Sequence, residues 1–150
     1  MIRDYQRYCG SALAILIDNW DGPINVRRAF PDRNGYYLIE EKLPIAMKFS
    51  RSRKGPWTFN YQRENQILYN ELVRVFGNCV TAYTCGTDGV VAVEHAQLRQ
   101  FLDEVFEEQE SVSIRRKLKQ MYSIRGRDGT LNKKVARDSY VKLVRELLQS

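Results

Sequence analysis

Histidine and cysteine, the side chains that build most zinc and redox sites, are scarce in this sequence. The chain has one histidine, His95, and three cysteines, Cys9, Cys79 and Cys85. The cysteine spacing matches no zinc-finger pattern, and a lone histidine leaves little material for histidine-based catalysis. Because an odd number of thiols at these spacings suggests no disulfide framework, we expect free, buried cysteines in a reduced, cytoplasmic chain.

Long apolar runs and flexible segments are missing as well. The longest apolar run, residues 12–17, is far shorter than the ~20 residues that span a bilayer. Polar residues rather than a small-residue cleavage site follow it, so neither a transmembrane helix nor a signal peptide is expected. Four prolines and nine glycines in 150 residues exclude a collagen-like or linker-dominated chain. A hydrophobic content of 43% instead predicts one globular domain over residues 1–150.

Basic residues are present in excess, and the net charge is +6. They fall in two blocks: residues 42–63 hold six bases and no acid, and residues 111–150 hold eleven bases and three acids. Residues 94–110, between the blocks, hold one base and six acids. A fold that brought the basic blocks together would offer a docking surface for a polyanion. The alternative is that the charged blocks only solvate separate faces.

Hydrophobic periodicity in the first half predicts a helix followed by antiparallel strands. Apolar residues recur at intervals of three and four from Arg3 to Asn19, which is typical of an amphipathic helix. The β-rich runs 24–30 and 36–39 flank Asn34-Gly35, a dipeptide that strongly favours a hairpin. A meander of three or four strands is completed by the runs 45–50 and 57–61.

The second half predicts alternating helices and strands. The expected elements are a helix at 62–76, a fully buried strand at 79–85, a strand at 90–93, an amphipathic helix at 94–108, a strand at 112–114, a turn or hairpin near 126–129, and a basic helix at 133–148. With the first half, they predict an α/β (α+β) fold in which helices flank a mixed sheet of about five strands.

Carboxylates and a lysine lie around the second expected strand. Asp32 follows Pro31, and Glu40-Glu41-Lys42 follows the apolar strand. Together with the order helix, three antiparallel strands, helix and strand, this pattern resembles the PD-(D/E)XK nucleases, whose fold is restriction-endonuclease-like. The resemblance implies that an aspartate and a Glu-x-Lys hold Mg²⁺ and orient the attacking water. Carboxylate oxygens suit Mg²⁺, and the lysine stabilises charge that develops in the reaction.

In a literal alignment with that motif, Asp32 and Glu40 are the metal ligands and Lys42 is the catalytic lysine. Alternation along a strand would put Glu40 and Lys42 on one face, as the chemistry requires. The alternative is an ordinary hairpin with a charged, exposed end, in which Asp32 is a turn residue.

In a shifted alignment, Lys48 on the third strand takes the lysine role. Ala46 then stands where the metal-binding acid should be, so this alignment departs from the family pattern at a metal ligand. Glu64, from the following helix, would have to supply the missing carboxylate. Without that carboxylate, the resemblance implies an inactive site.

Two basic stretches are candidates for contacts to nucleic acid. Residues 48–59 interleave bases with hydroxyl and aromatic side chains, and Arg, Lys and Ser are typical phosphate ligands. Trp57, Phe59 and Tyr61 alternate, so we expect them to share one buried face rather than to stack on bases. The predicted phosphate contacts are Arg51, Arg53, Lys54, Arg115, Arg116, Lys117, Lys119, Arg125 and Arg127.

These features predict a nucleic-acid-binding protein with duplex DNA as its partner and no contact with a membrane. If the carboxylates and the lysine assemble, the resemblance implies a Mg²⁺-dependent DNA endonuclease of the restriction or homing type, working as a homodimer or homotetramer. The alternative is a catalytically inactive module of nuclease-like fold that binds DNA, RNA or a protein partner through its basic surface.

Overall fold

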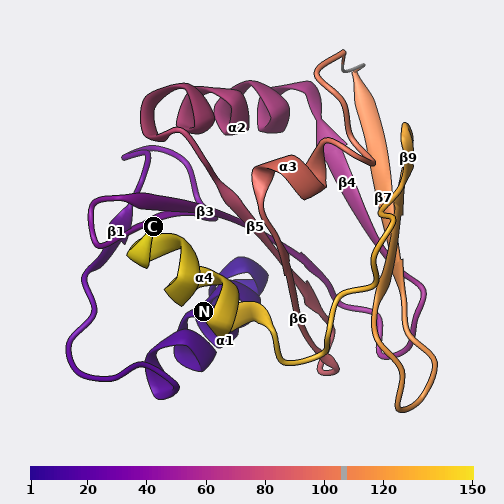
Figure 1. Cartoon of the computed structure of the whole chain (residues 1–150), viewed down its shortest axis with the longest axis horizontal. Coiled ribbons are helices and arrows are strands. Elements are labelled where there is room, and N and C mark those ends of the chain that lie inside the picture. The colour runs from indigo at the N-terminus through magenta and orange to yellow at the C-terminus, as the bar shows by residue number, and fades with distance from the viewer. Residues whose placement is uncertain (106–107) are drawn as a thin grey trace.

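The computed structural model describes residues 1–105 and 108–150 (Figure 1). The elements in these ranges are α1 (Asp4–Asp18), β1 (Val26–Arg28), β2 (Tyr36–Ile39), β3 (Leu43–Ser50), β4 (Trp57–Gln62), α2 (Arg63–Phe76), β5 (Val80–Cys85), β6 (Gly89–Val93), α3 (His95–Leu98), β7 (Gln109–Arg115), β8 (Ser123–Gly126), β9 (Gly129–Thr130) and α4 (Tyr140–Gln149). The strands form two separate sheets.

One sheet is mixed and has five strands in the order β1-β2-β3-β5-β6. Its first three strands are an antiparallel meander, β5 runs parallel to β3, and β6 returns antiparallel to β5. The other sheet is antiparallel throughout, in the order β4-β7-β8-β9. We call them the mixed sheet and the antiparallel sheet. The predicted α+β class and the mixed five-stranded sheet are confirmed, and the second sheet is an addition.

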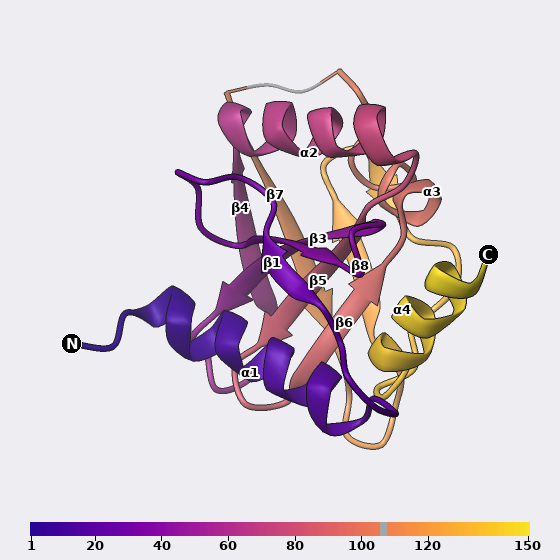
Figure 2. The same cartoon turned by 90° about the vertical axis from the view of Figure 1, so that its left-hand side faces the viewer.

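The mixed sheet is the central layer of the molecule. One of its faces packs against α1 and α4 through a cluster that includes Leu16, Ile45 and Val144. Its other face packs on the antiparallel sheet and α2, where the rings of Phe59 and Tyr83 lie 4.8 Å apart. Figure 1 shows α1 and α4 on one side and the antiparallel sheet on the other, and Figure 2 shows α2 lying across one end of the layers. Every residue of β5 is buried, as expected for a strand covered on both faces.

The meander is shorter than the sequence predicted. We expected residues 57–61 to join the same sheet as residues 45–50, but β4 pairs with β7 in the antiparallel sheet. The reason is that both edges of β3 are already occupied, by β2 and β5. β4 keeps the expected alternation, with three aromatic residues buried and three polar residues exposed. The aromatic residues therefore lie in the core, as predicted, and do not stack on bases.

The helix predicted at residues 94–108 is reduced to the four-residue α3. After it the chain turns so that Phe101 and Leu102 are fully buried. Arg99 donates a hydrogen bond of 3.0 Å to the carbonyl oxygen of Leu102, which supports this turn. Burial of these two side chains overrides the helical periodicity. Residues 106 and 107 of the predicted helix lie outside the described part of the chain.

The last helix also begins later than the sequence predicted, at Tyr140 rather than near residue 133. Val135 forms an antiparallel bridge with Tyr122, in which the two N···O distances are 2.8 and 2.9 Å. This pairing holds the segment in an extended conformation beside the antiparallel sheet, so the helix cannot start there.

Other predictions agree closely with the structure. α1 and α2 match the predicted helices within one residue at each end, and the turn near 126–129 joins β8 to β9. All three cysteines are free and buried. Among residues 1–105 and 108–150, no helix is long and apolar enough to span a bilayer.

Candidate functional site

Lys48 lies near the end of β3 on the face that packs toward the antiparallel sheet. Its ammonium nitrogen is 4.4 Å from the centroid of the Tyr61 ring. The Tyr61 hydroxyl shares a 2.8 Å hydrogen bond with the Tyr83 hydroxyl, which fixes the ring beside the lysine. Burial lowers the pKa of Lys48 to about 8, because the charged form loses water and gains no carboxylate in return.

A cavity of about 350 Å³ surrounds the exposed side of Lys48. Residues from α1, β2, β3, β4 and α2 line it, so the fold assembles it from segments far apart in the sequence. No Asp or Glu is among the described lining residues. Besides Lys48, the polar side chains that line it are Asn34, Tyr36, Thr58, Asn60, Asn65 and the two tyrosines Tyr61 and Tyr69, with Tyr5 at the α1 side.

The sheet register explains why the cavity lacks a carboxylate. Tyr36 of β2 pairs with Ala46 of β3, and the Met47 amide donates a 2.7 Å hydrogen bond to the Gly35 carbonyl. The alanine that the shifted alignment placed at the acid position therefore lies two residues before Lys48 on the same face of the strand. A methyl group occupies the place where that alignment requires a metal ligand.

The fold does not bring together Asp32, Glu40 and Lys42, the residues of the literal alignment. Asp32 precedes β2 and Glu40 follows it, so the whole strand, roughly 10 Å long, separates them. The Glu40 carboxylate accepts a 2.8 Å hydrogen bond from the backbone N–H of Asn25. Glu41 forms an ion pair of 2.7 Å with Arg27. Lys42 is exposed at the start of the next strand and has no carboxylate within ion-pair distance among the described residues.

The fold does not bring together Lys48 and Glu64, the residues that the shifted alignment requires. Arg33 bridges Asp32 and Glu64, with N···O distances of 3.2 and 2.6 Å. These two carboxylates are therefore brought together, but by a guanidinium, and neither lines the cavity of Lys48. Among the described residues, no three His, Cys, Asp or Glu side chains are placed to hold a metal ion. The donor set does not fit the predicted Mg²⁺, and we derive no step through a metal.

A second candidate surface is the outer face of the antiparallel sheet, which no described helix covers. The inward positions of its strands are apolar except for Glu110, and the outward positions carry hydroxyl, amide and guanidinium groups. A hollow of about 630 Å³ lies on this face. Its polar lining residues are Gln109, Glu110, Ser111, Ser113, Arg115, Ser123, Arg125, Arg127 and Thr130. We call this set the basic sheet face.

Arg115, Arg125 and Arg127 give the basic sheet face its positive charge. Glu110 is the one carboxylate among the described lining residues, and its side chain is 0% exposed. Its carboxylate accepts a 2.8 Å hydrogen bond from Gln66 and lies 3.8 Å from the Arg127 guanidinium. Arg115 and Arg125 are exposed. The face therefore presents cationic groups among neutral hydrogen-bond donors.

Strand β4 connects the two candidate surfaces. Thr58 and Asn60 line the Lys48 cavity. Their cross-strand partners on β7 are Ser113 and Ser111, which belong to the basic sheet face. Since neighbouring strands lie ~4.8 Å apart, the two hollows are next to each other. Thr58 belongs to the stretch 48–59 that the sequence analysis selected, whereas Asn60, Ser111 and Ser113 were missed, although the polar alternation along β4 was a usable signal for Asn60.

The predicted phosphate contacts divide into three groups. Arg115, Arg125 and Arg127 come together on the basic sheet face. Arg53 and Lys54 are exposed in the loop that leads from β3 to β4, as is Arg51, which forms a 3.1 Å ion pair with Asp4 of α1. The remaining residues, Lys117 and Lys119, are exposed in the connection from β7 to β8, and Arg116 beside them is not.

Arg116 differs from the other predicted phosphate contacts, because its side chain is only 8% exposed. Its guanidinium donates hydrogen bonds of 2.6 and 2.9 Å to the two carboxylate oxygens of Asp88. Its third nitrogen donates to the Lys117 carbonyl at 3.4 Å. Each of the three guanidinium nitrogens of Arg116 therefore has a partner inside the protein.

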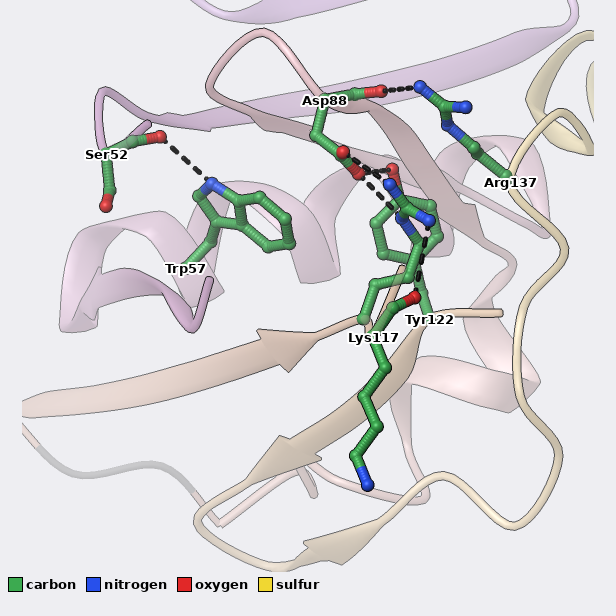
Figure 3. Close-up of polar contacts among 7 residues, drawn as sticks. Ser52, Trp57, Asp88, Lys117, Tyr122 and Arg137 are labelled. Atoms are coloured by element: carbon green, nitrogen blue, oxygen red, sulfur yellow. Dashed lines mark hydrogen bonds and ion pairs between the residues drawn. The ribbon is translucent and has the colours of Figure 1, made fainter. Parts of the chain in front are cut away.

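Asp88 organises this region from the turn between β5 and β6. It also accepts a 2.5 Å hydrogen bond from the Tyr122 hydroxyl, while its carbonyl accepts one of 3.1 Å from Arg137 (Figure 3). The Arg116 guanidinium and the hydrogen-bond donors together lower the pKa of the Asp88 carboxyl. The turn Gly86-Thr87-Asp88-Gly89 is therefore a junction between the two sheets.

Comparisons with known proteins give no family. No protein-family model matches this sequence, no curated protein matches it, and no solved structure matches its fold. The functional conclusions below therefore rest on the geometry of this chain alone.

Proposed function

We propose that this protein binds nucleic acid through the sugar-phosphate backbone, using the basic sheet face. The observation that carries the proposal is the combination on that face of Arg115, Arg125 and Arg127 with serine and threonine hydroxyls, while Glu110 is turned inward. Guanidinium and hydroxyl groups are the usual partners of phosphate oxygens. The exposed loop residues Arg53 and Lys54 extend the positive charge beyond the sheet.

Duplex DNA is the partner that we propose. Proteins that hold single strands stack the bases on exposed aromatic rings. The aromatic side chains of β4 are buried, and no aromatic residue is among the described lining residues of the basic sheet face. A surface of cations and hydroxyls without stacking rings suits a duplex, whose bases are already stacked. Binding should then depend weakly on base sequence.

A restriction-endonuclease-like core is the finer fold proposal. It is supported by the order of α1, three antiparallel strands, α2 and a strand parallel to β3. The donor set around Lys48 does not support metal-dependent cleavage, so the geometry favours the non-catalytic, nucleic-acid-binding alternative. Assembly into homodimers or homotetramers, expected by analogy with nucleases, stays a prediction.

The test is a measurement of duplex DNA affinity by fluorescence anisotropy at several salt concentrations. Replacing Arg115 and Arg125 together by Gln should reduce affinity and lower the slope of log K against log salt by about one for each phosphate that the variant no longer neutralises. The matched control replaces Arg7 and Arg28 by Gln, since both are exposed and lie outside the antiparallel sheet. Equal decreases in affinity for the two double variants, or no binding by the wild type, would overturn the proposal.

A further inference from the structure

We propose that the cavity around Lys48 holds the terminal phosphoryl group of a nucleic-acid strand bound on the basic sheet face. The inference rests on the proposed function and deepens it, because it assigns a role to a cavity that backbone contacts alone do not need. The ligand class is a phosphate monoester, such as the phosphorylated end of a strand.

The charge of the cavity selects an anion. Lys48 brings an ammonium group into a partly buried position on β3, beside the Tyr61 ring. No Asp or Glu is found among the described residues that line the cavity, and no described carboxylate lies within ion-pair distance of the lysine. A buried cation without a protein anion is costly, and an anionic ligand would provide the missing partner.

The neutral lining fits the oxygens of a phosphate. The residues Asn34, Asn60 and Asn65, which carry amide groups, and Tyr36 and Thr58, which carry hydroxyls, line the cavity together with Lys48. Each can donate a hydrogen bond to an anionic oxygen. The one contact between them is long, 3.4 Å from the Asn65 amide nitrogen to the Tyr36 hydroxyl. These donors are therefore available for a ligand that accepts several hydrogen bonds at once.

Size and position point to a strand end rather than to an internal phosphate. The volume of about 350 Å³ is at the lower end of the range of small-ligand sites, enough for a phosphoryl group and part of its nucleoside. An internal phosphodiester continues in both directions, whereas a terminal phosphoryl group needs access from one side only, through the open side of the cavity. Thr58 and Asn60 line the cavity and pair with Ser113 and Ser111 of the basic sheet face. A strand on that face would thus end about one strand spacing from Thr58 and Asn60, which line the cavity.

The experiment compares short duplexes that carry a 5′ phosphate, a 3′ phosphate or hydroxyls at both ends. The wild type should bind one of the phosphorylated duplexes about tenfold more tightly than the hydroxyl duplex, as expected for charge-assisted hydrogen bonds to one added group. In Lys48→Met this preference should disappear while affinity for the hydroxyl duplex is unchanged. Lys42→Met is the matched control, because Lys42 is exposed at the opposite end of β3 and should keep the preference.

A second variant keeps the test decisive if Lys48→Met folds poorly. Asn34 is exposed at the rim of the cavity, and Asn34→Asp adds a negative charge there at nearly constant volume. The preference for a phosphorylated end should disappear in this variant too. Equal affinities of the wild type for all three duplexes would overturn the inference, as would a preference that survives in both cavity variants.

A separate probe distinguishes failure of the cavity from failure of the sheet face. A nucleoside 5′-monophosphate, titrated into labelled protein, should shift the side-chain amide NMR signals of Asn34 and Asn65 in the wild type but not in Lys48→Met. If no duplex binds but these signals shift, the proposed function fails and the cavity is a site for free phosphate monoesters. If the hydroxyl duplex binds but the signals do not shift and no end is preferred, only the cavity inference fails.

Discussion

The guanidinium of Arg116 binds both carboxylate oxygens of Asp88, at 2.6 and 2.9 Å, and so ties the end of β7 to the turn between β5 and β6. The pair links the two sheets at a point where the backbone itself makes no ladder between them. Tyr122, which is fully buried, donates a hydrogen bond to the same carboxylate. The basic sheet face is thereby anchored to the central layer of the molecule.

Asp88→Asn should lower the midpoint of thermal unfolding by several degrees, because it leaves Arg116 largely buried without its anion. The pKa of Asp88 is lowered in the folded state, so its contribution to stability is complete above the unfolded pKa of about 3.9 and is lost as the pH falls through the folded value. Thermal unfolding of both proteins across the acid range measures this. A difference that is constant from neutral to strongly acid pH would contradict the role of the carboxylate.

Lys48→Met should stabilise the protein near neutral pH. Since burial lowers the pKa of Lys48 to about 8, the charged lysine is a cost to the folded state at pH 7, and the free energy of unfolding of the variant should be about 1–3 kcal/mol higher. From pH 8 to about 10.4 the folded wild type loses its proton before the unfolded chain does, so its stability rises relative to that of the variant.

Denaturant unfolding of wild type, Lys48→Met and the exposed control Lys42→Met over this pH range measures the difference. Comparing variants cancels the titration of Cys9 and of the tyrosines that share the cavity, Tyr36, Tyr61 and Tyr69. A Lys48→Met variant that is less stable than the wild type at pH 7 would show that the ammonium is already satisfied in the free protein.

Gly86→Ala should destabilise the fold and displace the loop of residues 51–56, which connects β3 to β4. Gly86 has a φ of +54°, and a Cβ there would lie 2.2 Å from the carbonyl oxygen of Ser52. That oxygen already accepts a 3.0 Å hydrogen bond from the Trp57 ring nitrogen (Figure 3). The strained backbone alone costs about 1–3 kcal/mol. Gly22→Ala, with φ +80° and no neighbour within 4 Å, separates strain from collision, and equal destabilisation of both variants would contradict the collision.

Duplex DNA incubated with the protein and Mg²⁺ or Mn²⁺ should stay uncut, because the donor set around Lys48 contains no carboxylate. Nicking gels on a broad substrate library measure this. Cleavage that is abolished in Glu64→Gln and kept in Glu40→Gln would show that Glu64 leaves Arg33 and completes the shifted arrangement. Cleavage that is abolished in Asp32→Asn and Glu40→Gln would instead support the literal one.

The sequence predicted those parts of the fold that local periodicity determines. The helices of residues 4–18 and 63–76 and the buried strand of residues 80–85 have unbroken patterns, and the structure confirms them. The division of the strands into two sheets was not predictable. Alternation along β4 shows which side of the strand is buried, but it does not show which strand pairs with β4. The prediction of a helix at 94–108 was wrong, because burial of Phe101 in the core outweighed the helical spacing of the apolar residues in this segment.

The candidate site was predictable only in its cations. Charge counting found Arg115 and Arg125, because surface arginines keep their exposure in most folds. The same counting could not separate them from Arg116, whose anion, Asp88, is distant in sequence and is brought near by the fold. The motif predicted Lys48 as a special lysine, but the neutral residues around it, such as Asn65, come from other elements and have no spacing signal.

The most direct test of the central claim is an NMR titration of backbone amide signals with a short duplex at moderate salt. Contact through the basic sheet face predicts that the largest shifts fall on the outward residues of β7 and β8, including Ser113 and Arg125, and in the loop around Arg53. The face covered by α1 and α4 should be unaffected. Shifts confined to α1 and α4, or no shifts at all, would contradict the account.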